Sequence, residues 1–478
     1  WRLEIKGTEA EIGSYLLKIV ATDEFGLSSV YPIPYVIKEN SAPEKIKDIE
    51  DVLLTAKGKE FVIDMTEYVN DPDGEQLKYD VTAANAKVAF VNVSGDRLIG
   101  TALAYGSTDM TVTAKDARGE KVVFTFKVTV KDPSDPLSLY PNPVKDFLNA
   151  SGREEIVFTS GTTAAINLVA FCFGEAFITE GDEVIVTEAE HHSNIVPWQM
   201  MCQRKGAVLK VLPVDDSGHL MVEKLDELIT ARTKIMAVTH ISNVLGIINP
   251  VKDIIEKCHS KGVAVLVDGA QGAVHCRVDV QDLDCDFYVF SGHKLYAATG
   301  TGALYGKKKW LEAMPPYMGG GEMVGTVKFS GTTYAPLPMK YEAGTQNFAS
   351  AATLKPAIEF INLLNDNELI KYNDSVRDYL LEELTKDERI RLYGVPRGTN
   401  DEKIPLFSFT VEGVHHEDLA LILDKMGIAV RSGQMCAEPV MDRFGVTGML
   451  RASVAPYNTM EEAEYFVKCL NRVINMLM

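Results

Sequence analysis

The chain has 478 residues, of which 46% are hydrophobic and 24% charged, and its formal net charge is −19. This composition excludes a disordered chain, a collagen and a disulfide-dense scaffold, and the length predicts about three domains. No apolar run approaches the roughly 20 residues of a membrane helix. We therefore expect no membrane partner. Neutralising phosphates requires a basic face, so the acidic net charge also predicts no nucleic-acid partner.

Cysteine and histidine are distributed unevenly along the chain. All seven Cys and all nine His lie after residue 170, and residues 1–150 contain none of either. Unpaired thiols fit a reducing cytosol, so we expect a cytoplasmic location for the later part. The chain begins at Trp1 without a basic segment followed by an apolar one, which predicts that no signal peptide is present.

The first part contains an internal repeat with an offset of 93 residues. Residues 21–26 (ATDEFG) match residues 114–119 (AKDARG) at this offset. A period near 93 residues is the size of a small β-sandwich. We therefore predict the tail of one all-β repeat in residues 1–40, so that the chain opens in the middle of a domain, and a complete β-sandwich in residues 41–132.

Local patterns in this part indicate strands and turns. Residues 124–130 alternate apolar and polar side chains, which is typical of a half-buried strand. Residues 70–74 (NDPDG) predict a turn, in which Asp71 and Asp73 form either an Asx turn or a Ca²⁺ site. With this turn and the AKDARG strand end, the segment resembles the cadherin-like and immunoglobulin-like repeats of bacterial surface proteins, and the resemblance implies a secreted location.

Residues 133–150 are punctuated by four prolines and are predicted to be a linker. Within them, residues 139–149 (LYPNPVKDFLN) resemble the opening of a type IX secretion sorting domain. The further strands of such a domain do not follow, so we interpret this segment as a remnant. An ordinary proline-rich linker is the alternative.

From residue 155 onward, short apolar runs alternate with helical stretches. The candidate strands are residues 156–159, 184–186, 207–211, 235–238, 263–267 and 287–290. This alternation predicts an α/β fold with a parallel or mixed sheet and helices on both faces. Ligands of such sheets bind at the carboxyl ends of the strands.

Polar segments follow three of these strands, at residues 160–163 (SGTT), 268–271 (DGAQ) and 291–294 (SGHK). The first is suited to a phosphate at a helix N-terminus, or simply to capping. Asp268 after a buried strand is either an N-cap or a carboxylate with a buried partner. Lys294 is either a solvated loop lysine or a Schiff-base residue. Taken together, the three segments fit pyridoxal 5'-phosphate, which needs a lysine, an acid and an anion site.

Five longer motifs extend this pattern to the end of the chain. They are residues 155–163 (EIVFTSGTT), 190–198 (EHHSNIVPW), 291–296 (SGHKLY), 342–345 (EAGT) and 431–437 (RSGQMCA). With these motifs, residues 151–478 resemble the group II cysteine desulfurases of the Suf iron–sulfur system, within the class V aminotransferase family. The resemblance implies the pyridoxal-phosphate-dependent fold type I, with a large cofactor-binding domain in residues 151–334 and a small C-terminal α/β domain in residues 335–478.

The resemblance also implies roles for individual residues around the cofactor. Lys294 would bind it covalently and shuttle protons, and His191 would stack on its ring and take part in catalysis. The other cofactor-binding residues would be Asp268 at the pyridine nitrogen, Gln271 at the phenolate oxygen, Asn243 beside the ring, and Thr162, Thr163, Ser291 and His293 at the phosphate. Thr345 would reach the phosphate of a partner subunit in a homodimer.

For the substrate, the resemblance implies that Arg451 binds the carboxylate of L-cysteine, with Asn243 nearby, because a guanidinium suits a carboxylate. Cys436 would be the nucleophile that takes the sulfur as a persulfide, leaving L-alanine. A lone cysteine is otherwise usually a small buried apolar residue, but Cys436 lies in a polar loop near Arg431, where a cation favours the thiolate. The other cysteines lack metal-ligand spacing, so we expect no metal site.

The sulfur would pass to a Suf-type acceptor protein and serve iron–sulfur cluster assembly. Two alternatives remain open. One is a selenocysteine lyase acting on L-selenocysteine on the same scaffold. The other is a non-enzymatic surface-repeat chimera with an inactive desulfurase domain, because we find no counterpart before Ser151 of the family's leading segment, which contributes to the active site.

Overall fold

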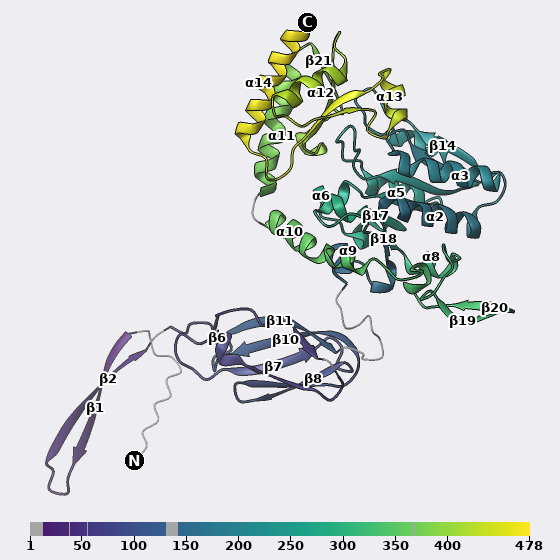
Figure 1. Cartoon of the computed structure of the whole chain (residues 1–478). Coiled ribbons are helices and arrows are strands. Elements are labelled where there is room, and N and C mark those ends of the chain that lie inside the picture. The colour runs from purple at the N-terminus through teal and green to yellow at the C-terminus, as the bar shows by residue number, and fades with distance from the viewer. Residues whose placement is uncertain (1–12, 38, 55, 131–141, 367–368) are drawn as a thin grey trace. The chain divides into compact units, whose positions relative to one another are not determined.

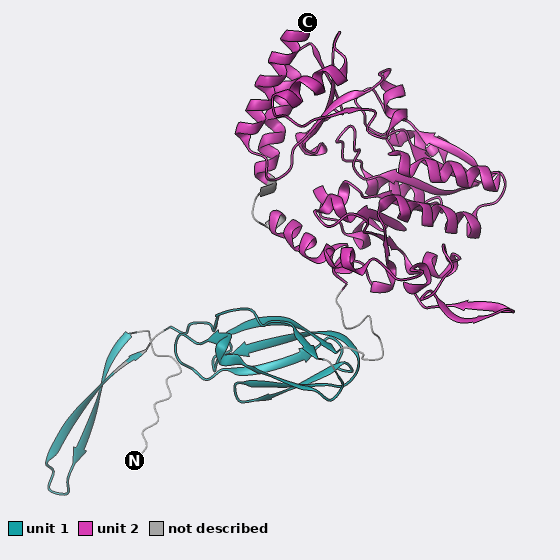
Figure 2. Ribbon diagram, in the orientation of Figure 1, with its two compact units in different colours: residues 1–141 teal, residues 142–478 magenta. Residues whose placement is uncertain are grey.

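In the computed structural model, residues 13–37, 39–54, 56–130, 142–366 and 369–478 are described. The chain forms two compact units, one up to residue 141 and the other from residue 142 (Figure 2). None of the helices in these described ranges combines the length and the apolar composition that crossing a membrane would require.

The first unit is all-β in its described residues (Figure 1). A hairpin consists of β1 (Gly13–Thr22) and β2 (Ser28–Ile37). The remaining strands are β3 (Glu44–Lys45), β4 (Val52–Leu54), β5 (Glu60–Asp64), β6 (Val69–Asn70), β7 (Lys78–Ala83), β8 (Ala89–Ser94), β9 (Arg97–Ala102), β10 (Gly106–Lys115) and β11 (Lys121–Val130). They form the sheets β4-β11-β10-β7, β5-β9-β8 and β3-β6.

The two larger sheets bury their apolar side chains in one common core. Leu98 on β9 and Val112 on β10 are both fully buried there. The predicted strand in residues 124–130 is part of β11, whose Phe124, Phe126 and Val128 are buried. The strands found in the described part of residues 41–130 suggest the predicted all-β organisation, whereas the complete β-sandwich repeat of residues 41–132 and its likeness to cadherin-like repeats stay predictions.

The predicted turn at residues 70–74 is an Asx turn. The side chain of Asp71 accepts hydrogen bonds from the backbone N–H groups of Asp73 (2.9 Å) and Glu75 (3.1 Å). Within the described residues, no group of three or more His, Cys, Asp or Glu side chains is arranged to hold a metal ion.

The second unit is built on a seven-stranded mixed sheet in the order β12-β18-β17-β16-β15-β13-β14. Its strands are β12 (Ile156–Thr159), β13 (Glu183–Thr187), β14 (Val208–Leu212), β15 (Thr233–Thr239), β16 (Ala264–Asp268), β17 (Phe287–Ser291) and β18 (Gly302–Gly306). All six predicted strands are present, shifted by no more than two residues. The expected mixed sheet is confirmed, with β18 antiparallel to both β12 and β17.

Apolar side chains on alternate sides of each strand explain why both faces of this sheet are covered. Leu266 of β16 belongs to a core with α2 (Thr162–Phe177) and α3 (Val196–Lys205). Val265 and Val267 of the same strand belong to the opposite core. The other short helices of this lobe are α4 (Leu225–Leu228), α5 (Val251–His259), α6 (Gly272–His275), α7 (Val280–Leu283), α8 (Lys308–Ala313) and α9 (Phe348–Ala352), and β19 (Val324–Lys328) and β20 (Gly331–Tyr334) form a small hairpin.

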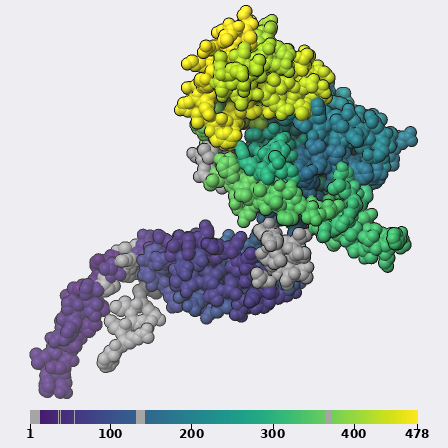
Figure 3. Space-filling view, viewed as in Figure 1, coloured from purple at the N-terminus to yellow at the C-terminus, as the bar shows by residue number. Residues whose placement is uncertain are grey.

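A second lobe of this unit has its own sheet and core, and is drawn in yellow and yellow-green in the space-filling view (Figure 3). Its four-stranded sheet has the order β21-β22-β24-β23. The elements are α11 (Leu369–Lys386), β21 (Ile390–Tyr393), β22 (Leu406–Val411), α12 (His416–Lys425), β23 (Arg431–Gly433), α13 (Glu438–Phe444), β24 (Met449–Ser453) and α14 (Met460–Leu477). This lobe thus combines helices with an antiparallel sheet, and its standing as a separate small domain stays a prediction.

Two predicted boundaries differ from the structure. Residues 142–150, expected in the linker, form α1 (Pro143–Phe147) and bury Val144, Leu148 and Ala150 in the core of the second unit. They therefore belong to this unit, because their apolar side chains find partners on it. The rest of the predicted linker, residues 133–141, lies outside the described residues.

The boundary between the large and the small lobe, expected between residues 334 and 335, also lies later in the chain. Helix α10 (Leu354–Asp366) buries Leu354, Ile358 and Ile361 in the core of the large lobe. The core of the small lobe begins with Val376 on α11. The division between the lobes thus falls between α10 and α11, because the apolar face of α10 matches the sheet of the large lobe.

Candidate active site

Polar side chains gather where the strands of the large sheet end. Strands β13, β15, β16 and β17 run parallel, so their carboxyl ends meet at one edge. Thr239 ends β15, Asp268 ends β16 and Ser291 ends β17. A cavity of about 220 Å³ lies at this edge, as the sequence predicted.

Nine of the residues predicted to bind the cofactor line this cavity together. They are Thr162, Thr163, His191, Asn243, Asp268, Gln271, Ser291, His293 and Lys294. Ser193, Thr239, Ile241 and Ala270 also line it and were missed. Thr239 could have been found by extending the predicted strand 235–238 by one residue, because the site follows the strand ends.

Hydroxyl groups cluster at the start of α2. The Ser291 hydroxyl accepts a hydrogen bond from the Thr162 backbone N–H and lies 2.8 Å from the Thr162 hydroxyl. The Thr163 hydroxyl lies 2.8 Å from that of Ser193. Gly161 precedes the helix with φ +144°, and a Cβ there would lie 3.1 Å from the Ser291 hydroxyl, so the turn favours glycine. Four hydroxyls at the N-terminus of a 16-residue helix suit a phosphate.

Asp268 and Lys294 lie on neighbouring strand ends in a largely buried environment. Burial raises the pKa of Asp268, and the Lys294 ammonium group partly offsets this. Burial likewise lowers the pKa of Lys294, against the opposing effect of Asp268. Asp268 accepts a hydrogen bond from the Ala270 N–H at 2.9 Å. A buried carboxylate at this place fits a protonated ring nitrogen, which would give it a charged partner.

His191 borders the cavity from the loop after β13. Its Nδ1 accepts a hydrogen bond from the Ser193 N–H at 3.0 Å. Burial, assisted by the nearby Lys294 charge, lowers the pKa of His191 to about 4. The imidazole is therefore neutral at physiological pH, which suits stacking against an aromatic ring.

Glu190, the neighbour of His191, is fully buried and holds this loop in place. It accepts hydrogen bonds from the Thr187 hydroxyl (2.6 Å), the Asn194 amide (2.6 Å) and the Thr239 N–H (2.8 Å). Burial raises the pKa of Glu190 to about 8. Sequence reasoning missed the role of this residue, because only the fold shows that it joins the ends of β13 and β15.

Arg451 and Cys436 lie in the small lobe and do not line the cavity, but both are near enough for their charges to influence the pKa of Lys294. Arg451 donates from Nη1 to the backbone oxygen of Asn243 at 2.9 Å. Its Nε is buried without a hydrogen-bond partner. Such an orphaned donor on a partly buried guanidinium fits an anionic ligand, and the expected contact with the substrate carboxylate stays a prediction.

Cys436 lies in the loop between β23 and α13. It is exposed, whereas the other six cysteines are buried or partly buried. Met435 and Cys436 have φ values of +55° and +57°, a left-handed conformation that costs free energy for non-glycine residues. The loop is held by hydrogen bonds from the Asn243 amide to the Met435 oxygen (2.9 Å) and from the His192 N–H to the Cys436 oxygen (2.8 Å). These bonds keep the thiol beside the residues that border the cavity.

Thr345 is exposed and does not line the cavity. It follows Gly344, which has φ +75°. Its expected contact with a partner subunit stays a prediction.

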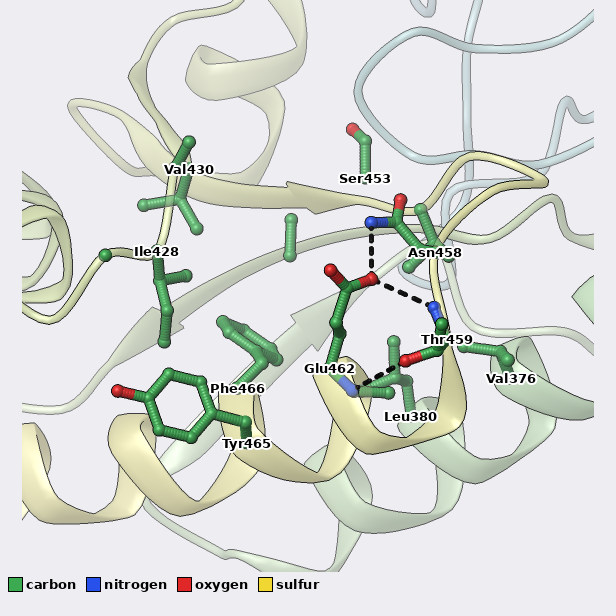
Figure 4. A pocket seen from close by; sticks show the side chains of 15 residues that line it. Val376, Leu380, Ile428, Val430, Ser453, Asn458, Thr459, Glu462, Tyr465 and Phe466 are labelled. Carbon is green, nitrogen blue, oxygen red and sulfur yellow. Dashed lines mark hydrogen bonds between the residues drawn. The ribbon is translucent and has the colours of Figure 1, made fainter.

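A second cavity, of about 300 Å³, lies within the small lobe (Figure 4). Its polar side chains are engaged in capping α14: Glu462 accepts hydrogen bonds from Asn458 and from the Thr459 N–H. The Thr459 side chain in turn accepts one from the Glu462 N–H. None of the predicted site residues lines this cavity, and its walls are mostly apolar.

Comparison with known proteins identifies the family of the second unit. The family model described as aminotransferase class-V matches residues 141–466. This chain belongs to the class-V aminotransferase family. The match begins near residue 142, where the structure places the start of the second unit.

The curated relatives of this class-V aminotransferase chain include cysteine desulfurases. One from Enterobacter sp. (strain 638) is 47% identical over 335 residues, which cover 70% of this chain and 81% of the relative. Another, from Pectobacterium atrosepticum, is 46% identical over the same shares of the two chains. At this identity and coverage, both matches show that the chain is related to the cysteine desulfurases of this family.

Solved structures give the same result. The cysteine desulfurase CsdA from Escherichia coli, an S-sulfonic acid form, has a TM-score of 0.66 and 43% identity, covering 70% of this chain and 83% of that one. The apo cysteine desulfurase from Thermococcus onnurineus NA1 has a TM-score of 0.67 and 35% identity, covering 70% and 82%.

Proposed function

We propose that this chain is a pyridoxal-phosphate-dependent cysteine desulfurase that converts L-cysteine to L-alanine and retains the sulfur as a persulfide on Cys436. The observation that carries this proposal is the joint placement of Lys294, Asp268 and the hydroxyls of α2 around one cavity. The exposed Cys436 in a loop bonded to Asn243 and His192 supplies the thiol that this reaction needs.

The residues fit the cofactor in type and placement. Lys294 would bind it covalently, Asp268 would face its ring nitrogen, and Gln271 its phenolate oxygen. Thr162, Thr163, Ser291 and His293 would hold its phosphate, with His191 and Asn243 beside the ring. When bound, the cofactor supplies an electron sink for a carbanion at the substrate's α carbon.

Lys294 and Arg451 prepare the substrate. Because burial lowers the pKa of Lys294, a larger fraction of its amine is neutral and can accept and return a proton. Arg451 is fixed by its bond to Asn243 and presents its unpaired Nε to the substrate carboxylate. This contact orients the substrate without involving the reacting sulfur.

Cys436 carries out the transfer of sulfur. Its thiolate attacks the substrate sulfur, so that an S–S bond forms while the C–S bond breaks and its electron pair stays on the β carbon. A proton added at that carbon completes L-alanine. Arg431, whose Nη2 donates to Sγ at 3.9 Å, orients the sulfur for this attack.

The proposal extends to three finer points. Thr345 would complete the phosphate site of the partner subunit in a homodimer. The persulfide would pass to a Suf-type acceptor protein for iron–sulfur cluster assembly, as the resemblance to group II enzymes implies. L-Selenocysteine is the alternative substrate, and parallel assays of sulfide and selenide release distinguish the two activities.

Absorbance and product analysis test the function. Purified chain incubated with pyridoxal 5'-phosphate should show a Schiff-base absorbance band, and Lys294→Ala should lose it. Added L-cysteine should yield alanine and a persulfide on Cys436, detected by mass spectrometry. Cys436→Ala should keep the band and lose the persulfide. A chain that binds the cofactor but makes no alanine would contradict the proposal and favour the inactive chimera.

A further inference from the structure

Residues 243–246 form a turn of the large lobe that is held by the small lobe. The turn follows β15, and the side chains of Val244 and Leu245 are fully buried in a core shared with the small lobe. Gly246 has φ +69°, and a Cβ there would lie 2.8 Å from the backbone oxygen of Leu406. The two lobes therefore meet backbone to backbone at this turn.

Four consecutive backbone carbonyls of the turn each accept a hydrogen bond from the small lobe. The donors are Arg451 Nη1 to Asn243 (2.9 Å), Ser408 Oγ to Val244 (2.6 Å), Lys403 Nζ to Leu245, and the Ile404 N–H to Gly246 (2.9 Å). Buried carbonyl groups require such partners. Because all four donors belong to the small lobe, this lobe sets the position of the turn.

Lys403 is an unusual donor for a buried carbonyl. Its side chain is fully buried, and its ammonium group lies 5.6 Å from the centre of the Phe407 ring. Burial lowers the pKa of Lys403 to about 7. Because burying a cation is costly, the contact with the turn explains the place of this lysine better than apolar packing does.

Asn243 connects the turn with the candidate active site. Its side chain lines the cavity and donates to the Met435 oxygen at 2.9 Å, next to Cys436. Its own backbone oxygen holds the guanidinium of Arg451. A displacement of the turn would therefore move Arg451 and the loop of Cys436 relative to the cavity.

We propose that Lys403 and Ser408 are positioning residues of the desulfurase reaction. By holding two carbonyls of the turn, they keep Asn243 where it aligns Arg451 with the cavity. Neither of them lines the cavity, so both act through the turn. The inference rests on the proposed function and adds that binding of the substrate carboxylate depends on groups buried between the lobes.

The first measurement uses the full chain without cofactor, so that it does not depend on catalysis. Lys403→Met and Ser408→Ala each remove one donor to the turn. Thr385→Val is the control, because the Thr385 hydroxyl donates to the Leu381 oxygen at 2.8 Å within α11 of the same lobe. We expect hydrogen–deuterium exchange of the amides in residues 243–248 to become at least about fivefold faster in the first two variants and to stay unchanged in the control.

The second measurement is the affinity for L-alanine, the product of the proposed reaction. Its binding to the chain loaded with pyridoxal 5'-phosphate is followed by the change in cofactor absorbance. Lys403→Met and Ser408→Ala should weaken binding at least about fivefold, and Ser408→Thr, which restores a hydroxyl, should recover most of it. With Arg451→Met present, Ser408→Ala should weaken binding no further, because both changes act through the same contact.

The outcomes separate this inference from the proposed function. The inference is overturned if exchange in the turn stays as in the parent, or if Ser408→Ala weakens L-alanine binding equally with and without Arg451. It is also overturned if the turn exchanges faster while the affinity is unchanged. A parent chain that binds no L-alanine contradicts the proposed function itself and, with faster exchange in the variants, limits both residues to a structural role.

Discussion

The Nη2 of Arg431 lies 3.9 Å from the sulfur of Cys436, the exposed thiol of the loop that follows β23. The guanidinium donates to the sulfur at this distance and so restrains the direction in which the thiol points. The other cysteines are buried or partly buried, so Cys436 is the most accessible of the seven thiols. The pair therefore gives a direct test of how this loop positions the nucleophile.

We expect Arg431→Met to slow the formation of the persulfide on Cys436 several-fold, because the sulfur loses the donor that orients it. Mass spectrometry of the persulfide after addition of L-cysteine measures this rate. Arg472→Met, which removes an exposed cation on α14, is the control and should leave the rate unchanged. Equal rates for Arg431→Met and the parent would show that Arg431 does not position the thiol.

Acid should destabilise the second unit through its buried histidines. Burial lowers the pKa of His240 to about 4 from the ordinary value of 6.5. Between these values the unfolded chain binds the proton and the folded chain does not, so stability falls as the pH decreases through this window. At pH 5 the loss from His240 is on the order of 2 kcal/mol.

Urea unfolding followed by tryptophan fluorescence checks this histidine effect, with His240→Gln beside the parent. The parent should lose more stability than the variant between pH 7 and pH 5. His191 and His275, whose pKa values burial also lowers to about 4, act in the same direction in both proteins. A parallel pH dependence of the two proteins would contradict the assignment.

The buried carboxyl of Glu190 should make stability change with pH in the opposite direction, and Glu190→Gln tests this. Because the pKa of Glu190 is raised to about 8, its carboxyl is mostly protonated at pH 7 and resembles an amide. The folded chain holds this proton more tightly than the unfolded chain, so the parent loses stability as the pH rises from about 4.5 through 8. We expect the stability of Glu190→Gln relative to the parent to increase over this range, as measured by urea unfolding. A constant difference from pH 5 to pH 8 would mean that Glu190 is ionised throughout.

Leu148→Ala should destabilise the second unit by about 2–5 kcal/mol, because it leaves a cavity in a packed core. Leu148 is fully buried and its backbone oxygen accepts a hydrogen bond from the Val280 N–H at 3.0 Å. Asp146→Ala removes only an exposed ion pair with Lys145 and should cost less than about 1 kcal/mol. If both variants unfold like the parent, residues 142–150 are part of the linker, as the sequence predicted.

The sequence by itself determined six of the seven strands of the large sheet, all except β18, and most of the residues at its carboxyl edge. These strands are short apolar runs followed at once by a polar residue such as Asp268 or Ser291. Such a pattern can be recognised from neighbouring residues alone, because both the apolar run and the strand end depend on local sequence. The 93-residue repeat likewise places two equivalent segments in the first part of the chain, and both are hairpins of the same register.

Only the tertiary structure decided which distant groups meet and what their environments are. The contacts of Asn243 with Met435 and Arg451 join residues about 200 positions apart, and no local pattern specifies them. The burial that shifts the pKa values of Glu190 and Lys294 arises from several elements at once. The docking of α1 was missed for the same reason: it follows a proline-rich segment that resembles a linker, and its place in the fold depends on an apolar surface formed by other segments.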